Sequence, residues 1–235
     1  MAASSKSTPS VAGPLKSTSD RYPRKGSCKI TSVSKKTIED RVQLPRLYLA
    51  WITPALFKPG DAELDVVSQI LAGGKNSRLY KRLVYDLQIA QDVTAFQASA
   101  ALDSQFQIIV TARPGDAAAS PAALVDRIKS IVDEEILKLQ QTPPTPREFQ
   151  RAINQVEASF YNRMESVGGF SGKGNQLNAY YTTTGNPDYF NEDLSRYRAL
   201  SAGDIQSAAG FWLPPNRRVE LTVEPMKAQG PGKHE

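Results

Sequence analysis

Alternating and helically spaced apolar residues mark the start of a folded body near Ile38. Residues 46–52 alternate between apolar and polar side chains, which predicts a strand. Residues 61–71 carry apolar side chains at helical spacing, which predicts a helix on whose face they lie together. We expect Asp61 to cap this helix and Gly73-Gly74 to end it.

The rest of the chain predicts one more hairpin and a long run of helices. A short helix is expected from Asn76 or Ser77 to about residue 86, and Lys29 to Val33 could add an edge strand. Further helices are expected at 121–142, 146–166, 173–183, 187–200 and 202–211, with strands at 91–101, 104–113 and 217–223. Because the strands cluster instead of alternating with helices, the order predicts an α+β fold in which helices cover an antiparallel sheet.

Charge and composition divide the 235 residues into three segments. Residues 1–46 carry ten Lys or Arg and three Asp or Glu, whereas the remaining residues carry 19 basic and 21 acidic side chains. The basic excess therefore belongs to an arm rich in Ser, Thr, Lys and Pro, which we expect to be disordered over residues 1–37. A folded domain is expected over 38–224 and a flexible tail over 225–235. Anion or nucleic-acid binding through the arm is an alternative function, but a solvated tail is the simpler interpretation.

Histidine and cysteine are too few for the common metal and nucleophile sites. The sequence has one histidine, His234, and one cysteine, Cys28, which lie at opposite ends of the chain. Zinc sites draw mainly on these two residue types, so we expect neither a metal nor a cofactor in this chain. No apolar run follows Met1 or is long enough to cross a bilayer, so a signal peptide and a membrane partner are not expected.

One serine pattern supports a second alternative function. Ser32 and Lys35 have the spacing of a Ser-x-x-Lys pair, in which the lysine could deprotonate the serine. Tyr189 belongs to a Tyr-x-Asn sequence that often accompanies this pair in serine esterases. These three residues would be the catalytic group of a serine hydrolase, although Ser32 lies at the edge of the disordered arm and a nucleophile needs a rigid position.

Residues 44–113 carry motifs more specific than these patterns. Leu71 to Lys81 reads LAGGKNSRLYK, and Leu83 to Val93 reads LVYDLQIAQDV. Together with Pro146-Arg147-Glu148-Phe149 and the following helices, they resemble the C-terminal, non-zinc domain of insulinase-type (pitrilysin) metallopeptidases, which include mitochondrial processing peptidase. The resemblance covers about residues 40–224 and implies a LuxS/MPP-like metallohydrolase fold.

The resemblance implies a function without catalysis in this chain. In the family an H-x-x-E-H helix of a different domain holds the zinc, and the halves close around an extended peptide. The chain would therefore form part of the peptide chamber and partner a zinc-bearing domain or subunit. A homodimer is also possible, and nucleic acid is not expected as a partner because the folded body is nearly neutral.

The family motifs also suggest roles for single residues. Gly73 and Gly74 would form the turn after the helix, with a positive φ angle, while Ser77 caps the next helix and Arg78 begins one of its faces. Some second halves of the family carry an Arg and a Tyr, seven residues apart, that assist the scissile carbonyl. These positions are occupied here by Val84 and Gln91, and Arg82 and Tyr85 are out of register, so no catalytic residue is expected.

Overall fold

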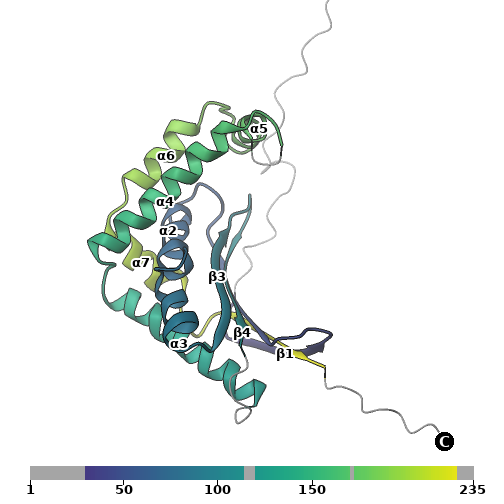
Figure 1. Ribbon diagram of the computed structural model, residues 1–235. Coiled ribbons are helices and arrows are strands. Elements are labelled where there is room, and N and C mark those ends of the chain that lie inside the picture. The colour runs from purple at the N-terminus through teal and green to yellow at the C-terminus, as the bar shows by residue number, and fades with distance from the viewer. Residues whose placement is uncertain (1–29, 114–119, 170–171, 227–235) are drawn as a thin grey trace, which may run out of the picture.

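The structure is a computed structural model and describes residues 30–113, 120–169 and 172–226. Its sheet has five strands in the order β1-β5-β2-β4-β3, and helices cover one face of that sheet (Figure 1). The strands are β1 (Ser34–Asp40), β2 (Arg46–Thr53), β3 (Ala90–Ala98), β4 (Ser104–Ala112) and β5 (Val219–Pro225). The helices are α2 (Asp61–Ala72), η1 (Tyr80–Asp86), α3 (Pro121–Gln141), α4 (Pro146–Glu165), α5 (Lys173–Thr184), α6 (Phe190–Arg198) and α7 (Ala202–Trp212).

The α+β class and the antiparallel core of the sheet are confirmed. β2 pairs antiparallel with both β4 and β5, and β3 pairs antiparallel with β4. The sheet is nevertheless mixed, because β1 pairs with β5 in parallel. The edge strand expected at Lys29 to Val33 lies further along the chain, because the described residues 30–33 are outside the sheet and β1 begins at Ser34. The side chains of β1 are almost all exposed and show no alternating burial, so no pattern marked its position. β1 also extends from Ser34 across the boundary expected between residues 37 and 38.

Alternation along the strands places the hydrophobic core between the sheet and the helices. Leu47, Leu49 and Trp51 of β2 point to the covered face and are at most 2% exposed. They pack with apolar residues of the facing helices, such as Ile70 of α2 and Ile128 of α3. Each such side chain contributes roughly 1.5–3 kcal/mol on burial, so this layer holds the helices in place.

Helix starts mostly follow the predicted chemistry. Thr145 and Glu148 form a reciprocal capping box at α4, and Ser201 and Asp204 form another at α7. Asp61 does not cap α2, because Gly60 occupies the cap position and its N–H donates to Glu63. The helix expected up to residue 86 is a π-helix, η1, over its last seven residues. α6 is shorter than predicted, because Tyr189 precedes its first turn.

A buried arginine ties β5 to the helical layer. Arg218, which directly precedes β5, is 3% exposed and donates two hydrogen bonds to Asp133 of α3. Its Nε also donates to Glu220 at 2.8 Å, and its guanidinium carbon lies 5.5 Å from the centre of the Trp51 ring.

None of the described helices is long and apolar enough to cross a membrane.

Candidate functional site

A polar crevice of about 430 Å³ opens between α2, β3 and the three helices α4, α5 and α6. We call it the polar crevice because most of the residues that line it carry hydroxyl, amide or charged groups. These residues include Asp65, Gln69, Gln97, Ser99, Gln155, Ser159, Arg163, Gln176, Tyr180, Thr183, Asp193 and Tyr197. Phe57 and Phe160 add two aromatic rings.

Asp61 and Arg196 form an ion pair next to this crevice, with neither residue part of its lining. Asp61 is 1% exposed and accepts hydrogen bonds from Ser99 Oγ at 2.6 Å and from the Phe57 N–H at 2.9 Å. Arg196 donates to Asp61 at 3.1 Å and to Asp193 at 2.8 Å, and its guanidinium carbon lies 5.0 Å from the centre of the Phe57 ring. One guanidinium therefore neutralises parts of two carboxylates.

Two tyrosine hydroxyls donate hydrogen bonds to carboxylates that line the crevice. Tyr180 donates to Asp193 Oδ2 at 2.9 Å, and Tyr197 donates to Asp65 Oδ2 at 2.7 Å. Burial and the neighbouring carboxylate raise the pKa of each of these tyrosines, so both hydroxyls stay protonated. Burial also raises the pKa of Asp193, although Tyr180 and Arg196 act in the opposite direction.

Asp65 has the most strongly altered carboxyl group of the crevice. Burial raises its pKa from the ordinary 3.8 to about 7, and the negative charges of Asp61 and Asp193 act in the same direction. The Tyr197 hydroxyl and Arg196 lower the pKa but do not compensate. The carboxyl group therefore changes its charge close to neutral pH.

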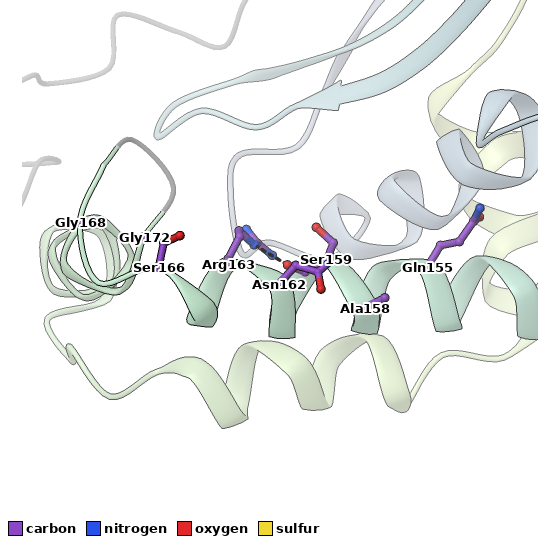
Figure 2. A pocket seen from close by; sticks show the side chains of 8 residues that line it. All are labelled: Gln155, Ala158, Ser159, Asn162, Arg163, Ser166, Gly168 and Gly172. Carbon is purple, nitrogen blue, oxygen red and sulfur yellow. Dashed lines mark hydrogen bonds between the residues drawn. The ribbon is translucent and has the colours of Figure 1, made fainter.

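Residues of α4 continue the crevice into a neighbouring surface groove. Figure 2 shows Gln155, Ser159 and Arg163 on successive turns of α4, and all three also belong to the wall of the polar crevice. Arg163 donates its Nε hydrogen to the Ser159 carbonyl oxygen and lies over the Phe160 ring, 4.7 Å from its centre. This arrangement places a second cation at the mouth of the crevice.

The chemistry of the crevice suits binding better than catalysis. In the described ranges, no group of three or more His, Cys, Asp or Glu is placed to hold a metal ion. Ser99 is within hydrogen-bond distance of a carboxylate, but Arg196 holds that carboxylate in an ion pair, so it is a poor general base. The crevice therefore offers donors, acceptors and charge to a ligand.

Asp65→Asn should remove a pH-dependent loss of stability. The folded-state pKa of Asp65 lies above its unfolded value, so folding takes up a proton between about pH 4 and pH 7 and the free energy of unfolding falls over that range. The asparagine variant should match the wild type near pH 4 and exceed it by about 1–3 kcal/mol at pH 8. Urea unfolding across this range measures it. The exposed Asp126→Asn serves as control, and a wild type with a flat profile would contradict the assignment.

The structure does not bring the predicted serine, lysine and tyrosine together. Ser32 is exposed and lies outside the sheet, and Lys35 of β1 makes an ion pair with Glu220 at 3.6 Å. Tyr189 directly precedes α6, a helix that lies far from β1 (Figure 1), and its ring packs on Phe57. Residues 1–29, which include Cys28 and most of the basic arm, and His234 lie outside the described residues.

The predicted turn residues form a compact structural group. Gly74 has a φ angle of 81°, whereas Gly73 has a φ of −73°. Ser77 directly precedes the next helix and its carbonyl accepts from the Lys81 N–H, but its hydroxyl donates back to the Gly74 carbonyl at 2.7 Å and makes no capping hydrogen bond. Arg78 donates two hydrogen bonds to Glu148 of the α4 capping box, at 2.8 and 3.1 Å, so the two family motifs are in direct contact.

The two positions that carry Arg and Tyr in some family members are also accounted for. Val84 lies in η1 and packs partly against the core, and Gln91 is exposed at the start of β3. Arg82 forms ion pairs with Glu134 and Glu135 of α3, so it serves the packing of η1. Glu135, a polar exception on the buried side of α3, is thereby neutralised.

Sequence reasoning missed the polar crevice. Asp61, Asp65 and Gln69 recur every fourth residue on α2, which places a polar line along one side of the helix. In α6, Asp193 and Arg196 are three residues apart, and each is followed by a buried residue, Leu194 and Tyr197. Such charged residues next to apolar positions were the available signal.

Comparisons with known proteins agree on one kind of domain. A family model described as the peptidase M16 inactive domain matches residues 5–156. A protease from Helicobacter pylori has a TM-score of 0.72 at 20% identity, over 87% of this chain and 47% of that one. A peptidase M16 inactive domain from Pseudomonas fluorescens has a TM-score of 0.69 at 19% identity, over 85% and 45% of the two chains.

An inactive peptidase domain from Bordetella parapertussis has a TM-score of 0.67 at 20% identity, over 84% of this chain and 99% of that one. The match thus covers about half of the first two proteins and nearly all of the third. At these identities the structures show a shared fold. No curated protein sequence matches the chain.

Proposed function

This chain belongs to the peptidase M16 inactive-domain family, and from that premise we propose that it partners a zinc-bearing peptidase domain and forms one wall of its peptide chamber. Its sequence has one histidine and therefore no H-x-x-E-H helix. In this proposal the partner supplies the zinc and the activated water, and this chain supplies surface.

The observation that carries the proposal is the open face of the sheet. Helices cover one face, and none of the labelled helices lies on the other (Figure 1). Tyr48 of β2 is directly opposite Ile109 of β4 and Leu221 of β5 on this face. All three side chains are partly exposed, and they form an apolar row across the middle strands.

A half-covered antiparallel sheet normally presents polar residues to water. The apolar row is flanked by Phe96 of β3 and Val219 of β5, which are 39% and 38% exposed. Exposed apolar residues that adjoin one another mark a surface that another chain covers. A chamber wall that contacts peptide or the partner domain accounts for this composition.

Reconstitution with a zinc-bearing M16 domain from the same organism tests the proposal. We expect this chain alone to hold no stoichiometric zinc and to cleave no quenched-fluorescence peptide. The two domains together should elute as one complex in gel filtration and cleave the peptide. Ile109→Glu places a charge on the open face and should lower kcat/KM of the complex by about tenfold, which corresponds to roughly 1.4 kcal/mol.

Leu137→Glu is the matched control, because Leu137 is 49% exposed on α3, in the helical layer. It should leave cleavage unchanged. Equal loss in both variants, or no complex between the two domains, would contradict the proposal. Circular dichroism of each variant shows that the comparison is made between folded proteins.

A further inference from the structure

The polar crevice holds a carboxyl group, that of Asp65, with which neither Arg163 nor Arg196 forms an ion pair. Arg196 forms ion pairs with Asp61 and Asp193, and Asp65 receives a hydrogen bond from the neutral Tyr197 hydroxyl. Within the described part of the chain, no Lys or Arg forms an ion pair with Asp65. A partly buried carboxylate without a cation is costly, and a bound cation would relieve that cost.

A second, independent observation comes from the sheet side of the crevice. Gln97 of β3 is 9% exposed and lines the crevice. Its Oε1 accepts a hydrogen bond from Thr53 at 3.0 Å, but its Nε2 has no hydrogen-bond partner. Buried amide groups are normally satisfied, so this free donor indicates that an acceptor belongs here.

The remaining wall suits the same type of ligand. The Phe57 ring, which Arg196 covers on one face, lines the crevice and adds apolar surface against which the methylene groups of a long cationic side chain can pack. A volume of about 430 Å³ accommodates a long side chain together with the adjoining backbone. The crevice therefore combines an anionic group, some apolar surface and a free amide donor.

We propose that the polar crevice binds a lysine or arginine side chain of a polypeptide, with its cationic group against Asp65 and a neighbouring carbonyl oxygen accepting from Gln97. The proposed function contributes only the polypeptide nature of the ligand. The charge and the acceptor follow from the crevice itself. Arg163 at the mouth favours ligands that bring one cationic side chain, because a second positive charge there would be repelled.

Isothermal titration of the purified chain with N-acetyl-arginine amide tests the proposal. We expect saturable binding with a dissociation constant on the order of millimolar, as is usual for a ligand of this size. N-acetyl-citrulline amide, which has the same shape without the charge, should bind at least tenfold more weakly. Asp65→Asn should weaken the arginine compound about tenfold, and Gln97→Leu about fivefold.

Binding should also tighten as the pH rises through about 7, because the ion pair requires an ionised Asp65. The other ionisable groups around Asp65 are Asp61, Arg163, Tyr180, Asp193, Arg196 and Tyr197. Burial raises the pKa of both tyrosines, so their hydroxyls stay protonated as the pH passes 7. In Asp65→Asn this pH dependence should be lost.

Asp92→Asn is the control, because Asp92 is exposed on β3, and it should bind like the wild type. Equal affinity for the citrulline compound, unchanged binding in Asp65→Asn, or no heat change at 10 mM ligand would each overturn the proposal. The experiment needs no zinc-bearing partner. Its failure would leave the chamber function standing, and failure of reconstitution would leave the binding result standing.

Discussion

Arg218→Ala should lower the free energy of unfolding by about 3–5 kcal/mol, which is the largest single effect that we expect. The substitution removes the guanidinium that pairs with Asp133 and, at 2.8 Å, with Glu220, which is only 6% exposed. It also removes a guanidinium from the face of Trp51 and leaves a cavity under β5. Urea unfolding followed by circular dichroism at pH 7 measures the loss.

Arg217→Ala is the matched control, because Arg217 precedes Arg218 in the chain and is exposed. Its effect should stay within about 0.5 kcal/mol. The double variant Arg218→Ala, Glu220→Gln should recover part of the loss, because Glu220 would otherwise keep only its longer ion pairs with Lys35 and Lys129, both at 3.6 Å. If Arg218→Ala and Arg217→Ala were equally stable, the buried ion pairs would not be holding β5 to α3.

Gly60→Ala should lower the free energy of unfolding by about 3 kcal/mol. Gly60 has a φ angle of 99°, in the region that residues with a Cβ rarely adopt, and such strain costs roughly 1–3 kcal/mol. A Cβ at this position would also lie 2.5 Å from Trp212 Nε1 and 3.0 Å from Pro54 Cγ. Thermal unfolding compared with the wild type reports both contributions together.

Gly185→Ala separates the two contributions. Gly185 ends α5 with a φ angle of 79°, but a Cβ there would meet no atom within 4 Å. Its loss should be about 1 kcal/mol, from the backbone alone. The difference between the two variants is then the cost of displacing Trp212 at the end of α7. Equal losses would mean that Trp212 moves aside freely.

Periodicity along the chain predicted the elements that form the core. β2 and β4 alternate because one face of the sheet is buried, so their pattern is visible without any knowledge of their partners. The capping box of α4 was predictable for the same local reason, since Thr145 and Glu148 are three residues apart. Local chemistry of this kind is present in the sequence itself.

β1, η1 and the polar crevice depend on contacts that no local pattern encodes. β1 is exposed on both faces, and its parallel partner β5 follows it by more than 180 residues. η1 contacts α3 through Arg82 and Glu135, which are 53 residues apart in the sequence. Asp61 and Arg196 are 135 residues apart, so their ion pair becomes apparent only when α2 and α6 pack together.

The place of β5 between β1 and β2 sets an order for synthesis on the ribosome. β2 must wait for one of its two neighbours until about 165 further residues have been made. At roughly 5–20 residues per second, the edge of β2 stays unpaired for about 10–30 s. During that time the nascent chain exposes backbone groups beside the apolar Leu47 and Leu49, which is the kind of edge that recruits other strands or chaperones. β5, the last strand to be synthesised, thus covers the open edge of β2, and β1 can join the sheet only after β5 is in place.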